Sequence, residues 1–243
     1  MILFASDLHL SPQSPGVTGL FLDFLAGPVR QAGELYLLGD LFEAWIGDDD
    51  LADPDNARIV AGLRAASEAG VRIGVLHGNR DFLLGPEFAQ ASGCQLLSEP
   101  YILSTPEWQF VLAHGDALCL DDLAYQQVRS QLRDPAWQQA FLARPREQRR
   151  QLAAQMRAQS IASQQAKDSP YSDLQAAATD DFLRDHGYAT FIHGHTHQPA
   201  THDHIVDGIH VERWVLGDWH ESHGDYLAWD GENLTRHRWP ASQ

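Results

Sequence analysis

Five short apolar segments recur along the chain, and each ends in polar side chains. They are ILFAS from Ile2, ELYLLG from Glu34, RIGVLHG from Arg72, FVLAHG from Phe110 and ATFIHG from Ala189. Runs of this length are typical of buried strands. The first three alternate with helical patterns at residues 18–31 and 56–69. Strand, helix, strand, helix, strand predicts an α/β fold with a largely buried sheet.

The C-terminal part follows a different pattern. Residues 209–217 and 224–231 alternate more clearly between apolar and polar side chains and carry Asp-Gly and Gly-Asp turn pairs. This pattern indicates antiparallel hairpins.

Residues 123–184 contain no strand pattern and are rich in Ala, Gln, Leu and Arg, which favour helix. Apolar side chains spaced four apart there can share one helix face. We predict a helical insertion, or lid, at 123–184 in a core made of residues 1–122 and 185–243.

The polar residues at the strand ends are of types that bind metal ions. They are Asp7, His9, Asp40, Asn79, His114, His195 and His197. In an open α/β sheet, ligands bind outside the carboxyl ends of the strands, so these side chains can meet in one crevice. Glycine precedes three of them, where the backbone must turn tightly or approach a ligand closely.

The spacing of these residues supports a shared site. Asp7 and His9 are two apart and can point to the same side of an extended chain, so they can share one ion. His195 and His197 lie about 7 Å apart by strand rise, which could reach two ions roughly 4 Å apart. Carboxylate, amide and imidazole without thiolate suit Mn²⁺, Fe²⁺ or Zn²⁺.

With this motif set the chain resembles the calcineurin-like metallophosphoesterases, and the resemblance covers the whole α/β part. It implies a sandwich of two β-sheets flanked by helices and two divalent ions per chain, Mn²⁺ being our expectation. It places Asp7, His9, Asp40 and His197 on the first ion. Asp40 would bridge to the second ion, which Asn79, His114 and His195 complete.

Three further stretches, DLFEAWIGDD, GNRDFL and HGDALCLDDLAYQQVR, are similar to the family of UDP-2,3-diacylglucosamine hydrolases of lipid A biosynthesis. That resemblance implies metal-activated water attack on the α-phosphorus of UDP-2,3-diacylglucosamine, giving UMP and lipid X (2,3-diacylglucosamine 1-phosphate). The catalytic residues it implies are Asn79, Arg80, His114 and His195. Arg80 could instead only pair with Asp81 or another local acid. The substrate contacts it implies are Asn79, Arg80, Asp122, Ser160, Gln164, Lys167 and His195. Gln164 and Leu120 depart from the Asn and Thr expected in that family.

The insertion has two features that suit a diacylated substrate. Its apolar side chains could line a cleft for the acyl chains, or could simply pack the insertion onto the core; they are Tyr125, Trp137, Phe141, Leu152 and Met156. The segment from Arg129 to Lys167 contains eight basic residues and only two acidic ones, although the whole chain has a net charge of −16. This run is either a solvated helix face or a surface for anionic head groups. The second interpretation predicts a cytoplasmic enzyme, peripheral on the inner membrane.

Composition excludes several other classes. The acidic charge argues against nonspecific nucleic-acid binding, and no obligate protein partner is predicted. No apolar run approaches the roughly 18 residues of a membrane span, and we expect no signal peptide. Cys94 and Cys119 are expected to be free thiols. A phosphoesterase with a soluble nucleotide substrate remains the alternative enzyme. A noncatalytic scaffold is disfavoured because such proteins usually lose metal ligands.

Overall fold

The computed structural model describes residues 1–165 and 173–241 and contains two β-sheets packed face to face. The six-stranded sheet has the order β11 (Leu234–Trp239), β10 (Gly224–Trp229), β1 (Ile2–Ala5), β2 (Glu34–Leu38), β3 (Arg72–Leu76), β4 (Gln95–Leu96). The five-stranded sheet has the order β5 (Tyr101–Ser104), β6 (Gln109–Leu112), β7 (Thr190–His193), β9 (Ile209–Val215), β8 (Ala200–Val206). The predicted two-sheet α/β fold is confirmed.

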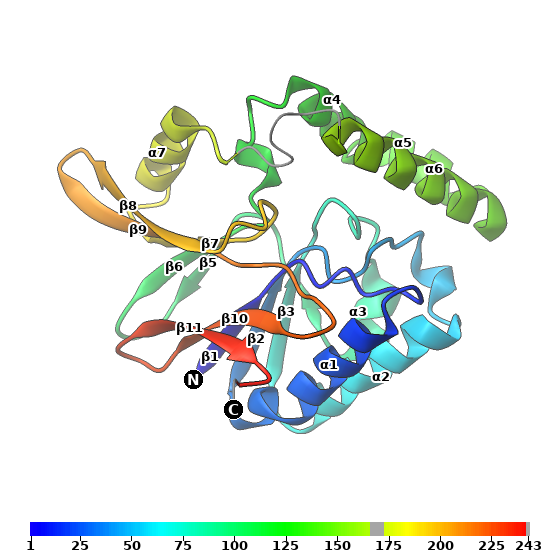
Figure 1. The fold of residues 1–243 in the computed structure, drawn as a ribbon, viewed down its shortest axis with the longest axis horizontal. Coiled ribbons are helices and arrows are strands. Elements are labelled where there is room, and N and C mark those ends of the chain that lie inside the picture. The colour runs from blue at the N-terminus through cyan, green and yellow to red at the C-terminus, as the bar shows by residue number, and fades with distance from the viewer. Residues whose placement is uncertain (166–172, 242–243) are drawn as a thin grey trace.

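Helices cover the outer faces of this sandwich (Figure 1). The helices α1 (Pro15–Ala26), α2 (Pro54–Glu68) and α3 (Pro86–Ser92) pack on the six-stranded sheet, and α7 (Ala176–Asp185) packs on the five-stranded sheet. All five predicted strands are present as β1, β2, β3, β6 and β7. Strands β1, β2 and β3 are parallel neighbours, and so are β6 and β7. The predicted hairpins are β8–β9 and β10–β11.

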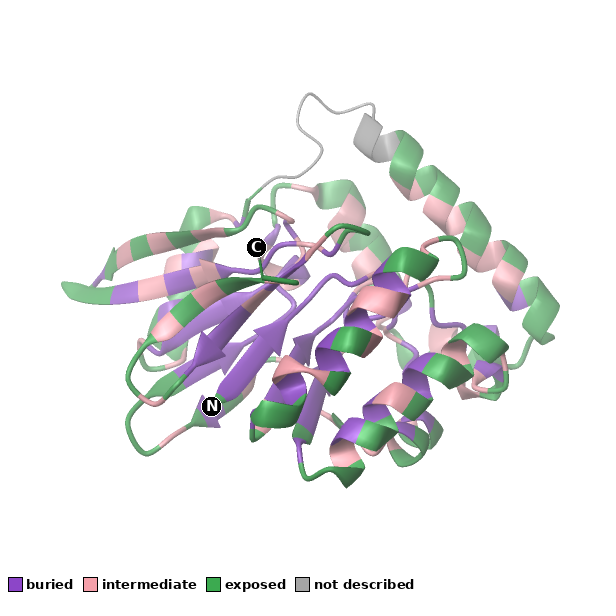
Figure 2. Cartoon of the chain, turned by 60° about the horizontal axis from the view of Figure 1, so that its bottom comes forward, coloured by how far each residue is buried: buried purple, intermediate pink, exposed green. Residues whose placement is uncertain are grey.

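The continuous apolar runs are explained by burial on both faces of each strand. In β1, Leu3 and Ala5 point toward the helices, whereas Ile2 and Phe4 point into the layer between the sheets. In β6, Phe110 lies in that middle layer and Val111 faces the side of α7. Successive strand residues point to opposite faces, so a strand between two layers has no polar face. The central strands are accordingly purple almost throughout Figure 2.

The insertion consists of α4 (Leu123–Leu132), α5 (Pro135–Leu142) and α6 (Arg146–Gln165), which form a layer apart from both sheets (Figure 1). Phe141 of α5 is 6% exposed and belongs to the same buried hydrophobic cluster as the inner faces of α1, α2 and α3. In α7, Leu183 is fully buried against the five-stranded sheet. The part of the predicted insertion that reaches into α7 therefore covers the sheet and is not part of the α4–α6 layer.

The basic residues of the insertion are directed at the acidic core. Arg149 is buried and pairs with Asp49, and Arg150 lies 2.6 Å from Asp50. Other pairs join Arg129 to Asp116, Arg146 to Asp50 and Arg157 to Glu43. The charges of these five arginines are therefore partly balanced by carboxylates of the same chain, and contact of the run with anionic head groups stays a prediction. Lys167 lies outside the described residues.

Candidate metal centre

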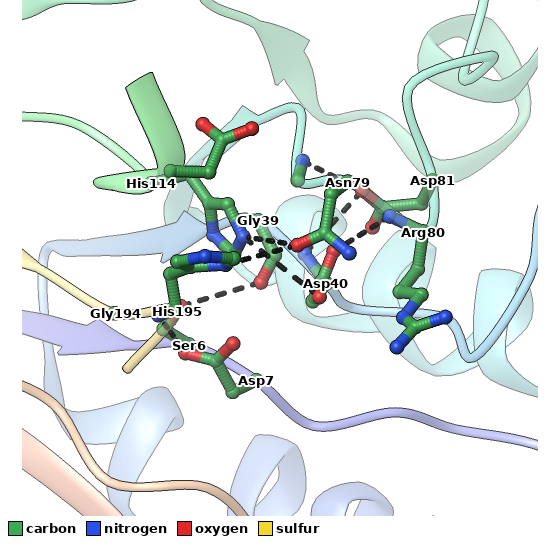
Figure 3. A network of polar contacts seen from close by, with 12 residues as sticks. Ser6, Asp7, Gly39, Asp40, Asn79, Arg80, Asp81, His114, Gly194 and His195 are labelled. Atoms are coloured by element: carbon green, nitrogen blue, oxygen red, sulfur yellow. Dashed lines mark hydrogen bonds and ion pairs between the residues drawn. The ribbon is translucent and has the colours of Figure 1, made fainter. Parts of the chain in front are cut away.

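The loops that follow β1, β2, β3, β6 and β7 meet at one edge of the sandwich. Figure 3 shows Asp7, Asp40, Asn79, His114 and His195 reaching this edge from different strands. His9 and His197 join them, since the Nε2 atoms of these two rings are 3.3 Å apart. All seven metal-ligand candidates of the sequence are therefore brought together.

Two groups of ligand atoms can be distinguished. Asp7, His9 and His197 form one group and Asp7, Asp40 and His114 form the other, with the ligand atoms of each group within 4.8 Å of one another. Asn79 belongs with the second group, because its Oδ1 lies 3.0 Å from His114 Nε2 and 3.0 Å from His195 Nδ1.

Asp40 lies between the two groups. Its Oδ2 is 3.9 Å from His9 Nε2 and 3.8 Å from His114 Nε2. The side chain is almost fully buried, and its Oδ1 accepts a hydrogen bond from the backbone N–H of Arg80 at 2.8 Å. A carboxylate held between two ligand groups is suited to bridge two ions.

The outward-facing nitrogens of three histidines lie close to oxygen atoms, the arrangement that is usual for metal-ligating imidazoles. His9 Nδ1 is 3.2 Å from Glu43 Oε2, and His197 Nδ1 is 3.3 Å from Asp218 Oδ2. His114 Nδ1 contacts the carbonyl oxygen of Leu38 at 2.9 Å. These contacts leave the Nε2 lone pairs directed at the centre.

Charge and burial also fit bound cations. Asp7 is fully buried, and its Oδ1 accepts no hydrogen bond from the described residues. Burial would raise the pKa of Asp7, but His197, His114 and His9 hold it well below its usual range. Burial, together with His114, lowers the pKa of His195 to about 4. A neutral His195 imidazole near pH 7 is the form that ligates a metal.

The backbone is left-handed at five of the seven positions. The φ angles are 55° at Asp7, 49° at His9, 52° at Asp40, 67° at His195 and 55° at His197. Non-glycine residues adopt this region rarely, so the recurrence marks loops that turn sharply to aim side chains. Glycines make room beside them. A Cβ at Gly78 would lie 2.0 Å from Asp40 Oδ1, and one at Gly194 would lie 2.1 Å from Asp7 Oδ2.

Comparison with known proteins agrees with this centre. Residues 1–199 match the model of the calcineurin-like phosphoesterases. The chain belongs to this family. A UDP-2,3-diacylglucosamine hydrolase of Aromatoleum aromaticum is 50% identical, covering 94% of this chain and 93% of its own. A protein of the same name from Chromohalobacter salexigens is 45% identical, covering 91% and 90%. A dimetal phosphatase of Danio rerio shares the fold, at TM-score 0.54, 15% identity, and 98% and 95% coverage.

In this phosphoesterase a buried carboxylate that the sequence did not single out connects two of the ligand loops. Asp81 is fully buried and accepts hydrogen bonds from the backbone N–H groups of Leu41 and Gly78, both at 2.8 Å. A third N–H, that of Asp40, lies 3.3 Å away. Burial and the nearby Asp40 carboxylate raise the pKa of Asp81. Asp81 therefore ties the Asp40 loop to the Asn79 loop.

Arg80 is next to this carboxylate but does not pair with it. Its side chain extends away from Asp81 in Figure 3. Its Nε is buried without a hydrogen-bond partner among the described residues. The alternative in which Arg80 only balances Asp81 has no support, because Asp81 is occupied by backbone N–H groups.

The structure describes only some of the side chains predicted to contact the substrate. Asp122 caps α4 by accepting a hydrogen bond from the N–H of Tyr125 at 3.2 Å, and Ser160 is half-buried on α6. Lys167 and the side chain of Gln164 lie outside the described residues. No hydrogen bond joins Asp122 to Ser160 among the parts of the chain that are described. Their roles as substrate contacts stay predictions.

The five candidates for the acyl cleft differ in their surroundings. The Tyr125 ring lies 5.4 Å from that of His195, and its hydroxyl donates to Asp116 at 2.7 Å, so this residue belongs to the polar edge. Trp137 stacks on Phe141 at 5.1 Å, and both pack against the core, as does Leu152. The burial of Phe141 is therefore explained by packing of the insertion on the core, which is one of the two interpretations of these side chains. Met156 is half-buried on α6.

Sequence reasoning missed Glu43, Asp218 and Asp81. The signal for Asp218 was present, because Leu-Gly-Asp follows β9 as it follows β2. Strand β9 is parallel to β7 and ends at the same edge. A carboxylate at a sixth strand end could therefore have been predicted from the pattern that gave the other site residues.

Proposed function

We propose that this phosphoesterase hydrolyses the pyrophosphate bond of UDP-2,3-diacylglucosamine, giving UMP and 2,3-diacylglucosamine 1-phosphate. Relatives of 44–50% identity over at least 90% of the chain bear the name of that hydrolase. The observation that carries the proposal is the Arg80 guanidinium, whose buried Nε has no hydrogen-bond partner among the described residues, beside a centre with a complete set of seven ligand residues. A pyrophosphate is an anion that such a cation can hold.

The centre would hold two divalent ions, one by Asp7, His9, Asp40 and His197 and the other by Asp40, Asn79, His114 and His195. When bound, such ions clamp a phosphoryl group and lower the pKa of a water molecule toward neutrality. We propose Mn²⁺ as the most effective ion, which the mixture of carboxylate, amide and imidazole supports. Elemental analysis should find both ions lost from Asp40→Ala, whereas Asn79→Ala mainly weakens the second. Two ions retained by Asp40→Ala would rule out the bridge.

Arg80 is proposed to hold the leaving phosphate. Arginine does not give up its proton near neutral pH, so it cannot act as a general acid. A phosphate leaving group needs little protonation, and a fixed cation stabilises the charge that develops on it. The guanidinium can donate two parallel hydrogen bonds to phosphate oxygens. Asn79 precedes Arg80, so the loop that supplies a metal ligand also aims the cation.

The test is UMP release by Arg80 variants. Arg80→Ala should keep both ions and lose about 10²–10³ in kcat, the scale for one such donor. Arg80→Lys should recover part of the loss, because it keeps the charge without the two-pronged geometry. Arg80→His should recover less near pH 8, where the ring is mostly neutral. Arg58→Ala, on the exposed side of α2, is the matched control. A histidine variant faster than the lysine variant at that pH would show that a proton is required.

Substrate choice is tested with two donors. UDP-2,3-diacylglucosamine in mixed micelles should be cleaved much faster than a soluble sugar nucleotide such as UDP-N-acetylglucosamine. Equal rates would favour a soluble nucleotide pyrophosphate as the substrate. We place the sugar and phosphate contacts at Asp122, Ser160, Gln164 and Lys167. The acyl chains would lie against the insertion near Trp137, Leu152 and Met156.

Peripheral attachment to the cytoplasmic face of the inner membrane belongs to the same proposal. No helix within the described ranges is both long and apolar enough to cross a bilayer. Support comes from large apolar side chains exposed on or next to the insertion: Leu120, Leu123, Val128, Leu142 and Ile161. Leu123→Glu should reduce co-sedimentation with anionic vesicles, whereas Ile205→Glu on β8, which is also mostly exposed, should not. Equal sedimentation of the two variants and the unmodified chain would contradict attachment through the insertion.

A further inference from the structure

One carboxylate connects a helix of the insertion to a residue of the metal centre. Arg157 of α6 pairs through Nε with Glu43 Oε1. The other oxygen of the same carboxylate, Oε2, lies 3.2 Å from His9 Nδ1. Arg157 and His9 are thus two opposite contacts of one side chain, although they are far apart in sequence.

The surroundings hold this chain of contacts in place. The side chains of Glu43 and His9 are 22% and 18% exposed, and that of Arg157 is 36% exposed. The backbones are fixed as well, since the N–H of Glu43 donates to Leu10 O and that of His9 donates to Asp40 O, both at 3.0 Å. With the backbones fixed, the orientation of the Glu43 carboxylate depends on its two contacts, one with Arg157 and one with His9.

The other ion pairs recorded for the described part of α6 join it to residues 49–53, away from the centre. Arg150 pairs with Asp50 at 2.6 Å and Asp53 at 2.9 Å, both in the loop that leads into α2. Arg149 pairs with Asp49 in the same loop. These pairs hold α6 on the core without contacting a metal-ligand residue. The Arg157 pair differs, because its partner Glu43 also contacts His9.

We infer that Glu43 and Arg157 are positioning residues that couple the packing of α6 on the core to the ligation of the first ion by His9. A carboxylate on the outer nitrogen of a ligating histidine fixes the ring and raises its basicity. Arg157 fixes that carboxylate in turn, so loss of the α6 contact loosens the ring. Such coupling is reciprocal, and ion binding should also favour the seated helix. The inference rests on the proposed first ion site and not on the substrate.

The first test measures Mn²⁺ dissociation constants by chelator competition, without substrate. Glu43→Gln should raise the constant about 10- to 100-fold, the usual effect of losing such a partner. Arg157→Gln should raise it about 5-fold or more. Simple charge removal predicts the opposite, because loss of a nearby cation favours a bound cation. The matched control is Arg150→Gln, which should change the constant less than about 2-fold.

A double variant separates action through Glu43 from a direct effect. If Arg157 acts through Glu43, adding Arg157→Gln to Glu43→Gln should change the constant no further. The second readout is hydrogen exchange of α6, which Mn²⁺ should slow in the unmodified chain and not in Arg157→Gln.

Three results would overturn the inference: unchanged or tighter binding in Arg157→Gln, equal weakening in Arg150→Gln, or additive losses in the double variant. The assumption beneath it is checked separately. His9→Ala binding Mn²⁺ as tightly as the unmodified chain would reject the ion site itself.

Discussion

The Asp81 carboxylate should be a main source of stability at the metal centre, even without metal. In Asp81→Ala, the N–H groups of Leu41 and Gly78 lose an acceptor at 2.8 Å inside the protein. Leaving a buried donor unpaired costs about 1–3 kcal/mol. Two such groups give about 4 kcal/mol, a large share of the 5–15 kcal/mol by which domains are typically stable. Asp81→Asn keeps one acceptor oxygen and should cost about half as much.

The assay is urea unfolding in excess chelator, so that loss of metal does not contribute. The slope of the free energy of unfolding against urea should stay constant, which would show that the denatured state is unaffected. Arg80→Ala is the neighbouring control and should cost less than about 0.5 kcal/mol, because its guanidinium makes no hydrogen bond within the described parts of the chain. If Asp81→Ala lost less than about 1 kcal/mol, water would be satisfying those N–H groups and the reasoning would fail.

Two further predictions concern packing and pH. Phe141→Ala should lower the free energy of unfolding by about 3–5 kcal/mol, because the ring is 6% exposed. The control Leu123→Ala, at a position that is 78% exposed, should cost less than about 0.5 kcal/mol. Comparable losses of the two variants in urea unfolding would contradict the packing of Phe141. Despite partial burial, which acts to raise it, the hydrogen bonds from Arg213 lower the pKa of Asp173 to about 2 from 3.8. This carboxylate therefore stabilises the fold above pH 3.8, and the stability gap to Asp173→Asn should shrink as pH falls from 3.8 toward 2. A gap that is constant over this range would reject the role of that ion pair.

The sequence predicted the parts of this protein that depend on repeating local patterns. Buried strands show as apolar runs, and their carboxyl ends coincide in space, so Asp7, Asp40 and Asn79 could be grouped by their positions after successive runs. The assignment of each ligand to an ion, and the pairing of two sheets, depended on the family resemblance.

What the sequence could not predict are contacts between distant segments. Asp81 was weighed only as a partner of its neighbour Arg80, because adjacent charges suggest pairing, yet it binds backbone groups of another loop. The arginines of the insertion suggested an exposed basic face, since their partners Asp49 and Asp50 lie about a hundred residues earlier. Glu43 gave no signal for the same reason.

The left-handed backbone at the ligand positions restricts how this centre can change by mutation. Each such position disfavours most side chains, at roughly 1–2 kcal/mol, while Asn and Asp tolerate it through local hydrogen bonds. At His9, His195 and His197, the replacements that the loops accept and that still ligate are therefore mainly oxygen donors. Loss of imidazole for oxygen shifts a site toward harder ions such as Mg²⁺. Selection for a different metal would thus be biased in one direction by the conformation of the loops, independently of what the reaction requires.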